Sequence, residues 1–83
     1  MSTVTGLKTI TSTQVAVFAG SSQLANRILV YVENRDDSIA IVVNGRYVEP
    51  LENTKIKPLS GSAVIYAYST GRAVQALVQE VSI

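Results

Sequence analysis

The chain contains no cysteine, histidine or tryptophan, and only two of its 83 residues are proline. Without cysteine it can form neither a disulfide framework nor a thiolate metal site. Without histidine or cysteine the commonest general bases and nucleophiles are missing, and catalysis would fall to Asp, Glu, Lys, Ser or Tyr. These absences argue against an enzyme, and we assign no catalytic, cofactor-binding or metal-binding residue.

Charge of either sign is also scarce. Seven Lys and Arg stand against six Asp and Glu, which gives a formal net charge of +1. Proteins that bind nucleic acid usually carry a clear positive excess, so we expect no nucleic-acid partner. No apolar run approaches the roughly 20 residues of a membrane-spanning helix, and the start MSTVTGLK lacks a signal-peptide pattern. We therefore expect no membrane partner and synthesis in a cytoplasm.

Strand-forming residues dominate what remains. Val, Ile, Thr, Tyr and Phe account for 31 of the 83 residues. Apolar residues recur at every second position, as in 64–68 and 74–78, and no window shows a helical stripe. The pattern predicts one all-β domain over residues 1–83, a small antiparallel β-sandwich or jelly-roll-like barrel of 7–8 short strands.

Turn signals divide the chain into these strands. The segment NRDDS, residues 34–38, predicts a hairpin loop between two apolar runs. Asn44-Gly45 predicts a two-residue hairpin turn. The Thr-rich residues 1–12 form either an edge strand or a mobile arm.

Two apolar faces emerge from the hairpin predicted around residues 34–38. One face would fill the core with Ile28, Val30, Val32, Ile39 and Ile41. The other face would gather Leu29, Tyr31, Ala40 and Val42 into one patch. Either a second sheet or the N-terminal arm covers this patch, or the patch contacts another subunit. Leu77, Val81 and Ile83 share one parity near the C-terminus and suggest a similar contact. The candidate subunit or capsid contacts are Leu29, Tyr31, Ala40, Val42, Leu77, Val81 and Ile83.

Other clusters have ordinary structural explanations. Glu33, Asp36 and Asp37 offer oxygen ligands for calcium, but their spacing matches no known calcium loop and favours a solvated hairpin tip. Lys55 and Lys57 share a strand face and are typical of a protected sheet edge. Three tyrosines raise the alternative of a small carbohydrate-binding β-sandwich with an aromatic stacking platform. They are Tyr47, Tyr66 and Tyr68.

The order of motifs over about residues 8–78 resembles the small β-sandwich structural proteins of tailed bacteriophages. Those proteins combine a Thr-rich start, a V-A-L/V strand, a V-x-I-x-N strand, a turn into a V/I-Y-V-G-like strand, a P-L loop and an L/I-Y-A-x-S-x-x-G-x-x-V-x-V ending. The matching residues here are Val15 to Val17, Ile28 to Asn34, Ile39 to Ile41, Pro50-Leu51, Ile65, Tyr66, Ala67, Ser69, Gly71 and Val74.

The resemblance implies a non-enzymatic virion protein without cofactors, most simply a head decoration (cement) protein on the surface of the phage head. Its partners would be the major capsid protein or other virion proteins. The chain itself would form a homo-oligomer, with a trimer favoured. A component of the neck, the tail or the base of a head fibre is the alternative that the same resemblance implies.

Overall fold

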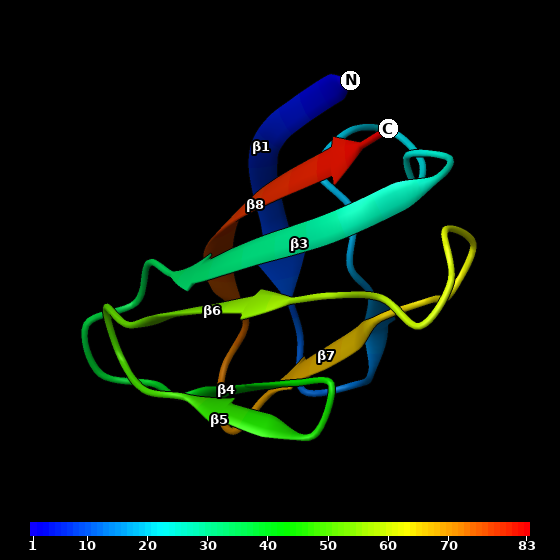
Figure 1. Cartoon of the computed structure of the whole chain (residues 1–83). Coiled ribbons are helices and arrows are strands. Elements are labelled where there is room, and N and C mark those ends of the chain that lie inside the picture. Colours follow the sequence, from blue (N-terminus) through cyan, green and yellow to red (C-terminus); the bar gives the residue numbers. More distant parts are fainter.

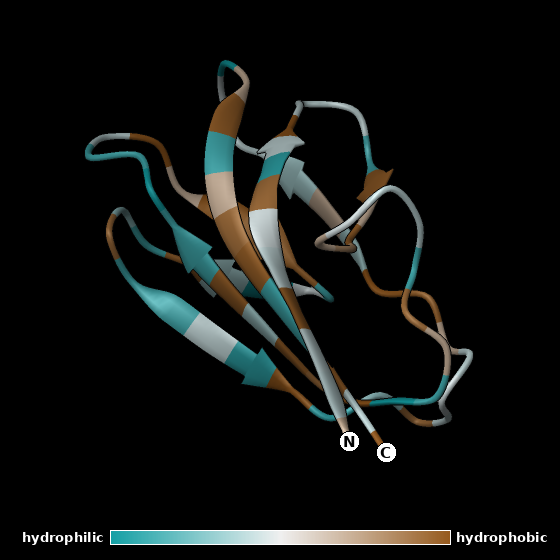
Figure 2. Cartoon of the chain, turned by 90° about the horizontal axis from the view of Figure 1, so that it is seen from above, coloured by the Kyte–Doolittle hydropathy of each residue, from teal (hydrophilic) through white to brown (hydrophobic).

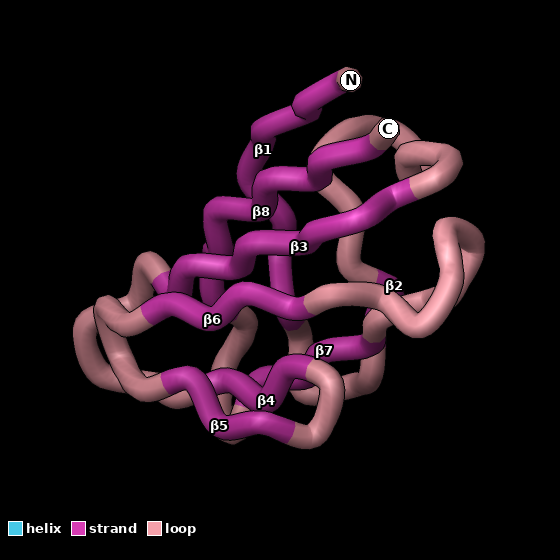
Figure 3. Tube along the Cα trace, viewed as in Figure 1, coloured by secondary structure: helices cyan, strands magenta, loops and turns pink.

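Eight β-strands and no helix make up the computed structural model, which describes all 83 residues. Sheet A contains, in spatial order, β1 (Ser2–Ile10), β8 (Val74–Ser82), β3 (Arg27–Asn34) and β6 (Asn53–Ile56). Sheet B contains β2 (Val15–Ala16), β7 (Tyr66–Ser69), β4 (Ile41–Val43) and β5 (Arg46–Val48). All strand pairs are antiparallel, and the sheets form two layers (Figures 1 and 3). The prediction of a small antiparallel β-sandwich is therefore confirmed. No helix in the structure is long and apolar enough to cross a membrane.

The core lies between the sheets and follows the alternation of the sequence. Along β8, Val74, Ala76 and Val78 are buried, whereas the intervening residues are partly or fully exposed. Figure 2 shows the same alternation of polar and apolar residues along the strands. Sheet B contributes residues such as Ile41 and Ala67 to the same cluster of twelve buried apolar side chains. Removing this surface from water is the main favourable term in folding.

A β-bulge in β3 reverses the predicted burial of one residue. Val30 and Val32 are fully buried as expected, but Ile28 is 42% exposed. The register between β3 and β8 shifts between Arg27 and Leu29, so one extra residue enters β3. Because of this bulge Arg27, not Ile28, points into the sandwich, and the prediction of Ile28 as a core residue is wrong.

The inward-pointing Arg27 forms an ion pair with Glu80, and both side chains have no exposed surface. Arg27 Nη1 lies 3.0 Å from Glu80 Oε2 and also donates to the carbonyl of Val17. The Glu80 carboxylate accepts the backbone N–H groups of Ala19 and Leu24. A buried ion pair offsets the cost of desolvation only when hydrogen bonds of this kind satisfy its other polar atoms, and here Arg27 Nε is the one buried side-chain atom left without a partner. The pair thus ties the loop between β2 and β3 to sheet A.

The prediction of a hairpin at residues 34–38 is wrong, because β3 and β4 belong to different sheets. The buried side chain of Asn34 accepts the N–H of Asp36 and donates to the carbonyl of Ile39 at 2.8 Å. The Asp36 carboxylate accepts the N–H groups of Ser38 and Ile39. Such local side-chain bonds satisfy the backbone that hairpin pairing would otherwise satisfy. The chain therefore crosses from sheet A to sheet B at this point.

The Asn44-Gly45 turn is confirmed between β4 and β5. Val43 pairs with Arg46, so two residues form the loop. Asn44 and Gly45 have φ values of 52° and 80°, and positive values at both positions characterise a type I′ turn.

Of the two possibilities for residues 1–12, the structure has the edge strand. Each residue of β1 pairs with β8, from Ser2 opposite Ser82 to Ile10 opposite Val74. Gly6 lies so close to the carbonyl of Ala19 that a Cβ atom there would overlap it. The N-terminal strand is therefore held by sheet A on one side and by the loop at Ala19 on its inner face.

Candidate functional site

The outer face of sheet A holds most of the predicted contact residues. In an antiparallel sheet, residues directly opposite one another share a face. Leu29 lies opposite Val81, and Tyr31 lies opposite Gln79. Leu77 lies opposite Glu33 on one side and Leu7 on the other. We define this surface, the outer face of sheet A, by the apolar residues Leu7, Leu29, Tyr31, Leu77 and Val81 and the polar residues between them.

Leu7 was missed by the sequence interpretation and is the most exposed apolar side chain of this face, at 61%. It is the one apolar member of the alternation Thr3, Thr5, Leu7, Thr9 on β1. That alternation could have placed Leu7 outside, but the sequence does not reveal that β1 pairs with β8. The pairing brings Leu7 beside Leu77 and extends the apolar surface to the sheet edge.

The polar residues of this face bind one another. Gln75 donates to the hydroxyl of Thr9 at 2.8 Å, and Tyr31 donates its phenolic proton to Glu33 at 2.9 Å. This hydrogen bond to a carboxylate is the main reason why the pKa of Tyr31 is raised, and burial adds to it. None of the three cavities of the molecule opens on the middle of this face. The surface mixes apolar with polar groups and has no hollow at its middle, which suits contact with another protein better than enclosure of a small molecule.

Ala40 and Val42 do not belong to this surface, so the expected patch of Leu29, Tyr31, Ala40 and Val42 does not form. Ala40 lies just before β4, and Val42 lies in β4, in the other sheet. The patch fails because it required β3 and β4 to pair. Val42 is only 4% exposed, since it lies between Tyr68 and Tyr47 in the register of sheet B.

Three tyrosines share the outer face of sheet B. Tyr68 and Tyr47 both lie opposite Val42, and Tyr66 lies two residues before Tyr68 on β7. Their exposed fractions are 64% for Tyr47, 46% for Tyr66 and 41% for Tyr68. The structure thus places together the three aromatic residues that the sequence suggested as a stacking platform.

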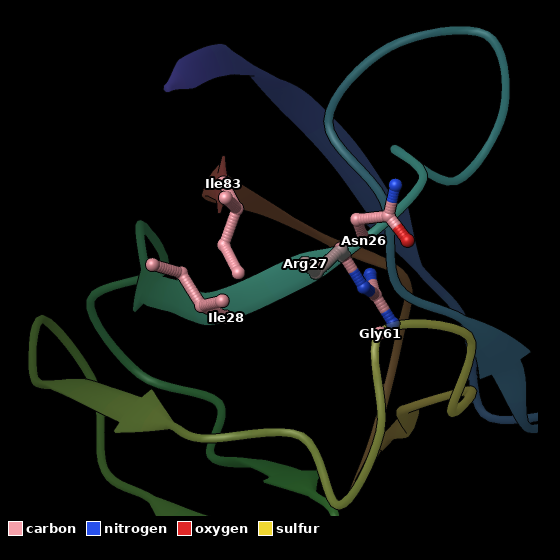
Figure 4. A pocket seen from close by; sticks show the side chains of 5 residues that line it. All are labelled: Asn26, Arg27, Ile28, Gly61 and Ile83. Atoms are coloured by element: carbon pink, nitrogen blue, oxygen red, sulfur yellow. The ribbon is translucent and has the colours of Figure 1, made fainter.

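Ile83 lies directly after the end of β8, at one end of the sandwich. It is 84% exposed and lines a hollow of about 300 Å³ together with Asn26, Arg27, Ile28 and Gly61. Figure 4 shows Ile28 and Ile83 on one side of the hollow and the Arg27 side chain directed away from them. The bulge that exposes Ile28 therefore creates a small apolar spot here.

The acidic cluster binds cations of the chain itself. Arg72 Nη1 lies 2.7 Å from Asp36 Oδ1, and Arg35 lies 3.6 Å from Glu33. The Arg72 guanidinium, followed by the N–H of Ser38, lowers the pKa of Asp36 to about 2. No three potential metal ligands of the acidic, histidine or cysteine type come together in the structure. Glu33 and Asp36 thus form separate ion pairs at one end of the sandwich.

Comparisons with models of protein families, with curated proteins and with solved structures find no match to this chain. The order of motifs in the sequence and the two exposed sheet faces are therefore the features of this chain that bear on its function.

Proposed function

We propose that the protein is a non-enzymatic structural component of a tailed-phage virion, and specifically a head decoration (cement) protein. The observation that carries this proposal is the outer face of sheet A, where Leu7, Leu29, Leu77 and Val81 form a partly exposed apolar surface that no other part of the chain covers. Contiguous apolar surface of this kind marks interaction sites on small proteins. The order of motifs in the sequence supplies the kind of partner.

A decoration protein stabilises a capsid by mass action. It binds the assembled lattice and not the free capsid subunits, so its binding free energy adds to the stability of the shell. This role requires a compact body with a flat contact face and no active site. A β-sandwich with one mixed apolar and polar face meets these requirements. A neck, tail or fibre-base component would use the same face but would be present in far fewer copies per particle.

The copy number of the protein in particles tests this proposal. Quantitative mass spectrometry on gradient-purified particles should find it at a copy number equal to that of the major capsid protein or a simple fraction of it. A few copies per particle would replace the head assignment by the neck, tail or fibre base. Absence from the particles would overturn the virion proposal.

A second candidate function is carbohydrate binding, which the shared position of Tyr47, Tyr66 and Tyr68 favours. Aromatic side chains on an exposed sheet face can stack on the apolar faces of sugar rings. A glycan array tests this candidate directly. Binding that Tyr68→Ala abolishes would support it, and an array without signal would eliminate it.

A further inference from the structure

The charged residues divide into those that are paired within the chain and those that are not. Three ion pairs form, namely Arg27 with Glu80, Arg35 with Glu33 and Arg72 with Asp36. Lys8 has a different partner, since its ammonium group lies 3.7 Å from the centre of the Phe18 ring. The cations without an acidic or aromatic partner are Arg46, Lys55 and Lys57.

All three of these cations line one hollow of about 240 Å³. It lies where β5, the edge of sheet B, faces β6, the edge of sheet A. Asn44, Val43 and Ile56 complete the wall, and no acidic residue is among the lining residues. Arg46 makes only a long contact of 3.5 Å with the Thr54 hydroxyl. We call this hollow, defined by Arg46, Lys55 and Lys57, the basic hollow.

The three carboxylates without a cationic partner are Asp37, on the β3–β4 connection, and Glu49 and Glu52, on the β5–β6 connection. The side chain of Asn34 joins the two loops that carry them, since it donates to the carbonyls of Ile39 and Glu49. The N–H of Leu51 also donates to the carbonyl of Asp36. We call this region, defined by Asp37, Glu49 and Glu52, the acidic end.

The basic hollow and the acidic end lie at opposite ends of the edge strands β5 and β6 and are close along them, since Glu49 follows Arg46, and Lys55 follows Glu52, by three residues. In Figure 1 the β3–β4 and β5–β6 connections, which carry the acidic end, lie at the left, and the β4–β5 turn, which carries Asn44, lies at the right. A chain with a formal net charge of only +1 therefore carries three unpaired positive and three unpaired negative groups in separate clusters. Two copies can satisfy both clusters, whereas one copy alone does not bring them together.

We propose that the basic hollow binds the acidic end of a second copy of this chain. The carboxylates of Glu49 and Glu52 would meet Lys55, Lys57 and the planar guanidinium of Arg46, which can hold a carboxylate with two parallel hydrogen bonds. Lysines on an edge strand also prevent strand addition, and this function is compatible with binding a neighbour's carboxylates. This self-association does not require the virion role.

The contact joins two different clusters, so it is either exchanged reciprocally around a twofold axis, which gives a dimer, or repeated head to tail as a heterologous contact. Repetition of a heterologous contact generates a ring when the rotation closes. A ring of three would be the trimer that the resemblance implies. The strand β3 is paired on both sides, by β8 and β6, and it can offer neighbours only its outer face.

Sedimentation equilibrium over micromolar to millimolar protein concentrations tests the proposal with neutral variants. We expect the wild-type chain to associate in about 0.01 M salt and to dissociate in about 1 M salt, since the Debye length falls from about 30 Å to about 3 Å. Lys55→Gln/Lys57→Gln and Glu49→Gln/Glu52→Gln should each weaken association at least tenfold. Ser21→Glu/Ser22→Glu changes the net charge as much as the lysine variant does, at exposed positions outside both clusters, and should associate as wild type.

Charge-reversal variants provide the decisive experiment. Lys55→Glu/Lys57→Glu and Glu49→Lys/Glu52→Lys should each be monomeric alone and should associate when mixed, because the mixture restores the contact between opposite charges. All four positions are exposed, so circular dichroism should show an unchanged fold. A wild-type chain that stays monomeric in low salt, neutral variants that associate like wild type, or a mixture that does not associate would each overturn the proposal.

Discussion

The ion pair of Arg27 and Glu80 shows how strongly burial determines the contribution of an ion pair to the stability of the fold. Arg27 donates to Glu80 and to the carbonyls of Val17 and Ala63, and neither charged side chain contacts water. Arg35 and Glu33 have the same chemistry, but their side chains are 51% and 32% exposed. Water competes for the exposed pair and screens it, whereas nothing replaces a missing partner in the core. The two pairs should therefore respond very differently to substitution.

Glu80→Gln should lower the free energy of unfolding by about 3–5 kcal/mol, because it leaves the Arg27 charge buried without a counter-ion. Arg27→Met/Glu80→Leu removes both charges but should not regain this loss, because it leaves the N–H groups of Ala19 and Leu24 and the carbonyls of Val17 and Ala63 without partners. Arg35→Gln at the exposed pair should change the free energy by less than about 1 kcal/mol. Urea unfolding followed by circular dichroism measures all three. Equal losses for Glu80→Gln and Arg35→Gln would contradict the stabilising role of the buried pair.

Asp36 makes the stability of the fold depend on pH in acid. Its pKa in the folded chain is about 2, below the ordinary value of 3.8, so the unfolded chain takes up a proton first as the pH falls. The stabilisation that Asp36 provides is thus complete above about pH 4 and is lost as the pH falls toward about 2. In thermal unfolding, Asp36→Asn should lower the melting temperature at pH 7, and the difference from wild type should disappear near pH 2. A difference that persists at pH 2 would show that the charge of Asp36 is not its cause.

At the scale of the elements, β1 depends on one close approach. The loop at Ala19 reaches the inner face of β1 where Gly6 has no side chain, and the N–H of Ala19 donates to Glu80 at 2.8 Å. The loop therefore links the edge strand β1 to the buried ion pair. A side chain at position 6 would disturb both.

Gly6→Ala should destabilise the fold by about 1–3 kcal/mol, as overpacking of a well-filled site does. Gly20→Ala is the matched control, because a Cβ atom there would meet only the Val4 side chain at 3.6 Å, an ordinary contact, and its effect should be within about 0.5 kcal/mol. Hydrogen exchange should show the loss of protection concentrated in β1 for Gly6→Ala. Equal effects of the two alanines would count against the close approach.

The sequence predicts which residues form the strands and turns, and which of them are buried, better than it predicts which strands pair. Alternation places Val74, Ala76 and Val78 correctly in the core, because a strand buries every second residue whatever its neighbour. Asn44-Gly45 predicts its turn correctly because the two positive φ values are a local demand. Two predictions are wrong, the one that places Ile28 in the core and the one that places Ala40 and Val42 in one patch with residues of β3. They fail because the bulge and the crossover at Asn34 depend on distant groups such as Glu80, Val48 and Glu49. The position of Leu7 on the apolar surface likewise depends on a distant group, since β1 pairs with β8 and brings Leu7 beside Leu77.

At the scale of the whole molecule, the two sheet faces make separable predictions about partners. On the proposed decoration role, Leu7→Asp should abolish binding to phage particles that lack this protein, because it places a charge in the apolar part of the outer face of sheet A. Tyr47→Asp is the matched control, since Tyr47 is 64% exposed and Leu7 61%, but Tyr47 lies on the opposite sheet. Cosedimentation of each variant with the particles measures the binding. Loss of binding by Tyr47→Asp alone would transfer the contact surface to sheet B.

The pairing of β1 with β8 has a consequence for the kinetics of folding. The first and last strands are neighbours from Ser2 opposite Ser82 to Ile10 opposite Val74, and Figure 2 shows the two chain ends side by side. β8 also separates β1 from β3, so sheet A has no continuous hydrogen-bonded middle before residues 74–82 arrive. Closing a loop of nearly the whole chain is a slow step, and folds dominated by such pairings typically form in milliseconds to seconds. A chain in which β8 has not yet paired is therefore an unfinished sandwich, in which Arg27 lacks Glu80 and the side of β1 that pairs with β8 has no hydrogen-bonding partner.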